Sequence, residues 1–85
     1  MENWYIHIIH FHRRGEDEVF LGPCTREVVL EWLPRNRFEI TEDIPTEIRG
    51  SRWITKEKIG LVAIFHPFTV KDLEGRIVKK LPRWF

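Results

Sequence analysis

The chain of 85 residues contains a single cysteine, no long hydrophobic run and no excess of charge of one sign. Because Cys24 has no second cysteine to pair with, an internal disulfide is excluded, and packing must provide the stability. The longest apolar run, Gly60 to Phe65, is far too short to cross a bilayer, and Met1-Glu2-Asn3 lacks the basic region of a signal peptide. These absences predict a cytoplasmic protein that does not associate with membranes.

The charge balance also bears on the class of partner. Fourteen Lys and Arg against 13 Asp and Glu give a formal charge of +1. A protein that binds nucleic acid mainly by neutralising phosphates normally carries a clear excess of basic residues. The sequence therefore favours a protein partner over a nucleic acid, although a local basic patch is compatible with it.

Aromatic residues are abundant, with 4 Trp, 6 Phe and 1 Tyr. A domain of this size removes only about two-thirds of its unfolded surface from water, so some of these rings must lie at the surface. Exposed aromatic surface often marks an interface. We therefore expect one domain, residues 1–85, that binds a partner, and homodimerisation through exposed rings is one form that this could take.

The N-terminal region has the pattern of a β-hairpin. From Trp4 to Arg13, aromatic and β-branched residues occupy nearly every position, so both faces are apolar and the strand is predicted to be central. Residues Arg14 to Glu18 supply turn chemistry and charge, and Val19 to Leu21 are predicted to return as the second strand.

A helix is predicted from Thr25 to Leu33. Thr25 is a good N-cap, and Val29, Trp32 and Leu33 fall on one face at helical spacing. Pro34 is expected to end the helix, because a residue that precedes proline is pushed out of the α region.

The C-terminal half is less regular. Residues 38–40 alternate like a short strand, and Asp43 to Gly50 predict a single capped helical turn. Leu61 to His66 form a run of the buried-strand type. Phe68 to Val70 are predicted to pair with Arg76 to Leu81 across a turn. The predicted fold class is α+β, with a small antiparallel β-sheet of about four to five strands and one main helix packed on it.

One ladder of spacings is more specific than the rest. Gly22-Pro23-Cys24 is followed after four residues by Val29, after two more by Trp32, and after three more by Asn36-Arg37-Phe38. Over residues 4–38 this ladder resembles the signature of the GYF domain, in which a Gly-Pro-Phe turn, a helix with Met and Trp, and a Gly-Tyr-Phe triplet follow an aromatic strand. Cys24 replaces a phenylalanine, Asn36-Arg37 replace Gly-Tyr, and Trp-x-Tyr has become the adjacent pair Trp4-Tyr5.

The resemblance implies a bowl of aromatic residues that receives proline-rich peptides, which suit such a bowl because a polyproline helix loses little entropy on binding. It implies a non-enzymatic module that binds an apolar or proline-rich segment of a partner protein. The C-terminal aromatic tail is expected to be a second contact, since large aromatics and Arg dominate interfaces. The predicted partner-binding residues are Trp4, Tyr5, Trp32, Arg37, Phe38, Trp84 and Phe85.

Chemistry at the histidines and the cysteine is the first alternative. His10 and His12 lie on one strand face, and Cys24 or His66 would have to complete a metal site, but no stronger ligand motif accompanies them. Cys24 near a helix N-terminus has the setting of an activated thiol, yet an 85-residue domain seldom encloses a catalytic pocket. We therefore predict no enzyme activity, no metal and no cofactor.

Two binding alternatives remain open. A nucleic-acid binder would use the basic C-terminal stretch Arg76, Lys79, Lys80 and Arg83, whose cations are followed by aromatic rings. A compact inhibitor of the kind made by mobile elements or phages would dock on a larger enzyme through a flat aromatic and charged surface. A second loose cluster consists of Arg35, Arg37, Arg49 and Arg52, and its role depends on how the fold arranges it.

Overall fold

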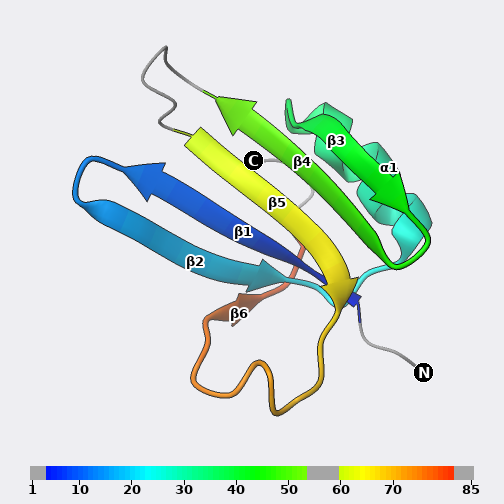
Figure 1. Ribbon diagram of the computed structural model, residues 1–85. Helices are drawn as coiled ribbons and strands as arrows, with labels where there is room; N and C mark the ends of the chain where they lie inside the picture. The colour runs from blue at the N-terminus through cyan, green and yellow to red at the C-terminus, as the bar shows by residue number, and fades with distance from the viewer. Residues whose placement is uncertain (1–3, 54–59, 82–85) are drawn as a thin grey trace.

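The computed structural model describes residues 4–53 and 60–81 (Figure 1). Within them, a six-stranded mixed sheet has the strand order β3-β4-β5-β1-β2-β6. All neighbours are antiparallel except β6, which pairs parallel with β2. The elements are β1 (Trp4–His12), β2 (Gly15–Leu21), α1 (Arg26–Arg35), β3 (Glu39–Ile44), β4 (Glu47–Trp53), β5 (Gly60–Pro67) and β6 (Val78–Lys79). The predicted combination of a small sheet and one helix is confirmed, but the strand count is higher.

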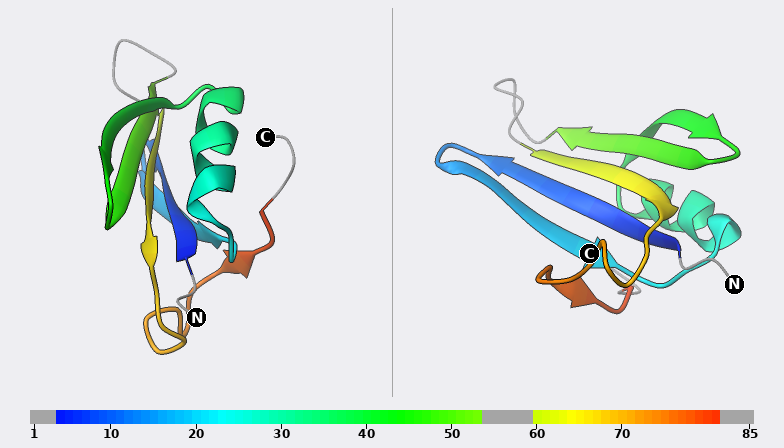
Figure 2. Two further views of the ribbon diagram at one scale, coloured as in Figure 1. Left: turned by 90° about the vertical axis from the view of Figure 1, so that its right-hand side faces the viewer. Right: turned by 60° about the horizontal axis from the view of Figure 1, so that its bottom comes forward.

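The strands β1 and β5 are the centre of the sheet, as their two-sided apolar patterns indicate. Register places Ile8 opposite Ala63 on one side and Val19 on the other. Helix α1 lies against this face, and Figure 2 (left) shows it on one side of the sheet. The buried core between the two layers consists of Ile6, Ile8, Leu21, Val29, Trp32, Leu33, Phe38, Ile48, Leu61, Ala63 and Phe65.

Helix α1 begins as predicted and ends later than predicted. The Thr25 hydroxyl accepts a hydrogen bond from the Val28 N–H at 3.3 Å, so Thr25 is the N-cap. The helix runs through Pro34 to Arg35, because a proline in the last turn removes only one intrahelical donor. The N–H groups of Arg37 and Phe38 then donate to the carbonyls of Pro34 and Leu33, at 3.0 and 2.9 Å. This is the Schellman pattern that closes many helices.

Three segments differ from the sequence prediction. The first hairpin turns at residues 13–14, so β2 already begins at Gly15. Residues 43–50 form no helical turn, because β3 and β4 make a hairpin in which Pro45-Thr46 is the two-residue loop. Phe68 to Val70 are not a strand, and residues 70–75 form turns that bring β6 beside Phe20 and Leu21 instead.

In the described part of the chain, no helix is both long and apolar enough to span a membrane.

Candidate functional site

The structure separates the two strand aromatics of the predicted site. Trp4 and Tyr5 are neighbours in β1, so their side chains point to opposite faces of the sheet. The Trp4 ring packs 4.9 Å from the Phe65 ring on the helix side. The Tyr5 ring makes an edge contact with Phe68 on the other side, at 6.4 Å. One bowl cannot contain both rings.

Trp32 and Phe38 belong to the core. Their rings stack with centroids 5.9 Å apart, and only 5% and 3% of the two residues are exposed. Their predicted role as partner contacts therefore has to be corrected, since almost no ring surface is accessible. The sheet and a single ten-residue helix need large side chains between them, and these two rings fill that space. The remaining predicted contacts, Trp84 and Phe85, lie outside the described residues, as does Arg83.

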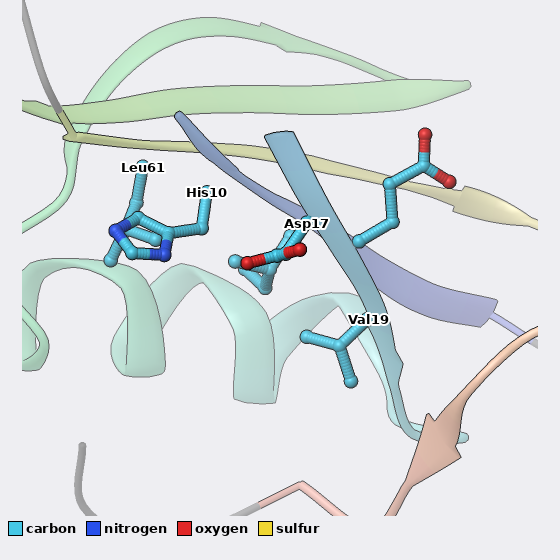
Figure 3. Close-up of a pocket in the computed structure, with 6 residues that line it drawn as sticks. His10, Asp17, Val19 and Leu61 are labelled. Atoms are coloured by element: carbon cyan, nitrogen blue, oxygen red, sulfur yellow. The ribbon is translucent and has the colours of Figure 1, made fainter. Parts of the chain in front are cut away.

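An apolar cavity of about 340 Å³ lies on the helix side of the sheet, near the β1–β2 hairpin (Figure 3). Ile8, Val19 and Leu61 provide its apolar floor. His10 and Asp17 stand at its rim, and Figure 3 shows both on the side of the sheet that α1 occupies. Glu18 is the sixth lining residue. We call this the hairpin cavity.

The lengths of the elements explain the hairpin cavity. A ten-residue helix is about 15 Å long, whereas a nine-residue strand extends about 30 Å. Helix α1 therefore covers one end of β1 and leaves the hairpin end without a layer above it in the described residues. Of the apolar side chains at that end, Val19 is partly exposed, whereas Ile8 and Leu61 are buried.

A second cavity, of about 460 Å³, lies at the end of β4. It is lined by Arg37, Glu39, Ser51, Arg52 and Trp53. Strand β3 starts at Glu39, opposite Ser51, so Arg52 and Trp53 extend beyond the end of their neighbour strand. We call this the edge cavity. It contains Arg37 from the predicted site, together with Arg52 from the loose arginine cluster.

The other two arginines of that cluster are elsewhere. Arg49 pairs with Glu47 at 2.5 Å and lies 3.4 Å from Glu42. Arg35 pairs with Glu31 one helical turn earlier, at 2.6 Å. The fold thus brings together only Arg37 and Arg52.

The face of the sheet opposite α1 is also partly apolar. Trp53 is paired with Gly60 across β4 and β5, and Phe11 of β1 lies on the same face. Because glycine has no side chain, the two rings approach across it, and their centroids are 6.4 Å apart. Val62 and Ile9 form the next row, and both are partly exposed. Five carboxylates surround this apolar strip, from Glu16, Glu18, Glu39, Glu42 and Glu47.

One end of that face is covered by residues 68–77. The Phe68 ring contacts His66 and Phe20, with centroids 3.9 and 5.0 Å apart. Arg76 donates to the Glu18 carboxylate at 2.8 Å, which holds the segment against β2. His7 stacks on Phe20 beneath it. Burial lowers the pKa of His7, and the Glu18 carboxylate, 3.5 Å away, opposes that shift.

Tyr5 lines a third cavity, of about 700 Å³, with Val70, Leu73 and Val78 of the C-terminal segment. Tyr5 is thus a predicted aromatic contact that borders a cavity beside the C-terminal segment. It is separate from Arg37, so the predicted site is divided among several locations.

The groups considered for chemistry are not assembled into a site. Burial raises the pKa of the Cys24 thiol to about 11, so at neutral pH it is not the reactive thiolate. The His10 and His12 rings are 5.7 Å apart, and His12 Nε2 lies 3.2 Å from Asp17 Oδ2. In residues 4–53 and 60–81, no three His, Cys, Asp or Glu side chains are placed to hold a metal ion together.

The basic C-terminal residues are distributed as well. Arg76 is ion-paired with Glu18, Lys79 lies in β6, and Lys80 is exposed just after it. The Glu18 carboxylate and its acidic neighbours lie on the adjacent strand. These contacts give a mixed electrostatic surface rather than a continuous basic stripe.

Sequence reasoning missed most of the residues that line the hairpin and edge cavities. His10, Asp17 and Leu61 come together through cross-strand register, and Arg52 is the next residue in the same row. The sequence alone does not show which residues are paired across neighbouring strands. The one usable signal was the Arg52-Trp53 dipeptide, because an arginine beside a tryptophan is typical of interface hot spots.

Comparison of the chain with known protein families, with curated proteins and with solved structures gave no significant match. The resemblance to GYF domains therefore rests on the spacings between Gly22 and Phe38.

Proposed function

We propose that this protein is a non-enzymatic interaction module that binds an apolar or proline-rich segment of a partner protein. The observation that carries the proposal is the hairpin cavity, which has an apolar floor of Ile8, Val19 and Leu61 and exposed residues, His10 and Asp17, at its rim. In this proposal an apolar side chain of the partner enters the cavity and completes the layer that α1 leaves unfinished.

The size and chemistry of the cavity support an anchor of this kind. A volume of about 340 Å³ is within the range of pockets that hold small ligands, so one large side chain with part of its backbone fits. Burying a Leu or Phe side chain contributes roughly 1.5–3 kcal/mol. Interfaces commonly depend on a few such anchors in well-defined pockets.

The spacings shared with GYF domains support a partner that is extended and apolar, since proline-rich segments are the ligands of that family. The contact surface in the proposal nevertheless differs from the family's bowl, because Trp32 and Phe38 are core residues here. The proposed contact surface lies on the same face of the sheet as α1, at the end that α1 does not reach.

A peptide selection tests the proposal. A random peptide library displayed on phage would be selected against the wild-type protein and against His10→Trp, which fills the mouth of the cavity without altering the buried floor. Val28→Trp is the matched control, because Val28 is 44% exposed on α1 and does not line the cavity.

We expect enriched peptides to share an apolar anchor, to bind the wild type and the control, and to lose binding to His10→Trp. Backbone amide shifts in an NMR titration should map to Val19 and Leu61. Peptides that bind His10→Trp as well as the wild type would refute the cavity as the anchor site.

A further inference from the structure

Two arginines and a half-exposed tryptophan are among the residues that line the edge cavity. Arg37 and Arg52 both line it, and 47% of Trp53 is exposed beside them. Within residues 4–53 and 60–81, neither arginine has an ion pair, whereas Arg35, Arg49 and Arg76 each have at least one. Guanidinium groups normally pair with carboxylates, often in a bidentate manner. The cavity therefore has positive charge that the fold does not use.

Arg37 also occupies an unusual backbone position. Its φ angle is 64°, in the left-handed region, at the place in the Schellman motif where glycine is the common residue. An arginine there costs free energy that glycine would not. Strained non-glycine residues of this kind cluster at binding sites. A charged residue therefore lines the cavity at a backbone position where glycine would be more stable.

The edge cavity adjoins the hairpin cavity. Arg52 lines the first, Leu61 lines the second, and the two residues are direct cross-strand partners in β4 and β5. Partners of this kind have Cα atoms about 5 Å apart. An extended peptide advances about 3 Å per residue, so side chains two positions apart can enter the two cavities together.

We propose that the edge cavity binds the side-chain carboxylate of an Asp or Glu in the partner, two residues from the apolar anchor. The inference rests on the proposed function, because the anchor in the hairpin cavity sets the position of the acidic residue. Arg37 and Arg52 hold the carboxylate.

The surrounding charges select a carboxylate over a nucleic acid. Glu39 lines the edge cavity itself, and Glu16 lies on the face of the sheet opposite α1, where Glu42 and Glu47 are paired with Arg49 and Glu18 with Arg76. A single carboxylate can lie between the two arginines. A chain of phosphates would have to pass close to Glu39 as well.

The test uses two defined probes in NMR titrations, the blocked tripeptides acetyl-Phe-Pro-Glu-amide and acetyl-Phe-Pro-Gln-amide. Phe is the anchor, and Pro holds the chain extended. The reporters are the Trp53 indole N–H and the Arg52 amide for the edge cavity, and the Val19 and Leu61 amides for the hairpin cavity. We expect the Glu probe to bind about fivefold more tightly than the Gln probe, as two partly exposed ion pairs allow.

Arg37→Gly is the diagnostic variant, because glycine suits the left-handed backbone and the fold should not suffer. It should weaken the Glu probe to the level of the Gln probe and leave the Gln probe unchanged. Arg52→Gln should act in the same direction. Arg35→Gln is the control, since it removes a nearby cation that does not line the cavity.

The outcomes separate this inference from the proposed function. Equal binding of the two probes, with shifts at Val19 and Leu61 only, would leave the anchor in place and overturn the carboxylate site. No shift with either probe would overturn both. Stronger shifts of Trp53 with a single-stranded oligonucleotide would assign the edge cavity to phosphates. Binding of the Glu probe seen only after deletion of residues 82–85 would assign the edge cavity to this chain's own segment. Either of these last two results would overturn the inference.

Discussion

Replacing Arg37 by glycine should make the protein more stable. The left-handed conformation costs an L-residue about 1–2 kcal/mol, and glycine adopts it without that cost. The glycine variant also loses about 0.5–1 kcal/mol of folding stability, because glycine makes the unfolded chain more flexible. The two effects leave a net gain of about 1 kcal/mol, which corresponds to a rise of about 4–8 °C in Tm for a domain of this size.

Urea and thermal unfolding followed by circular dichroism measure this change. Arg37→Ala is the control, because alanine removes the guanidinium but keeps the backbone cost, so its stability should remain within about 0.5 kcal/mol of the wild type. If Arg37→Gly were equal to or less stable than the wild type, the side chain would contribute more to the fold than its backbone costs. That result would also remove the argument that Arg37 is retained for binding.

Three other properties can be tested in the same way. Gly60→Ala should lower the free energy of unfolding by about 3 kcal/mol, because a Cβ there would lie 2.1 Å from the Arg52 carbonyl oxygen. Urea denaturation measures this loss, and a loss below about 1 kcal/mol would contradict the close approach of β4 and β5. Burial lowers the pKa of His7, so as pH falls through about 6.5 the unfolded chain takes up a proton that the native state resists, and stability declines. His7→Phe should flatten that decline, and an unchanged slope in unfolding curves measured between about pH 5 and pH 7 would exclude His7 as its source. Since burial raises the pKa of Cys24 to about 11, iodoacetamide should alkylate the native thiol slowly near neutral pH and faster toward pH 11; a native rate equal to that of the urea-unfolded chain would refute this.

Local signals predicted the parts of the fold that depend on local interactions. Thr25 and the spacing of Val29, Trp32 and Leu33 place α1, because a cap and a buried stripe are encoded within a few residues. The two-sided apolar patterns of residues 4–12 and 60–67 identify the central strands, since a strand paired on both sides is seldom polar on either face.

Contacts between distant segments were not predictable in this way. The parallel pairing of β6 with Phe20 and Leu21 joins residues far apart in the chain, and no local pattern encodes it. The β3–β4 hairpin was mistaken for a helical turn because Asp43 and Gly50 are typical of both caps and hairpins. The cavities were not predictable for the same reason, because each combines residues from strands whose register the sequence does not show.

Several of the residues that carry the resemblance to GYF domains, among them Trp32 and Phe38, are core residues of this chain. Helix α1 contributes Trp32, and the turn after it contributes Phe38; both rings are needed to fill the layer beneath a helix of ten residues. The adjacency of Trp4 and Tyr5 sends one ring into that layer and the other to the opposite face. What the fold leaves accessible is set by length instead: β1 and β2 continue beyond the helix, and β4 continues beyond β3. In our proposals, binding therefore depends on these two overhangs, where Leu61 and Arg52 bring an apolar cavity and a basic one side by side.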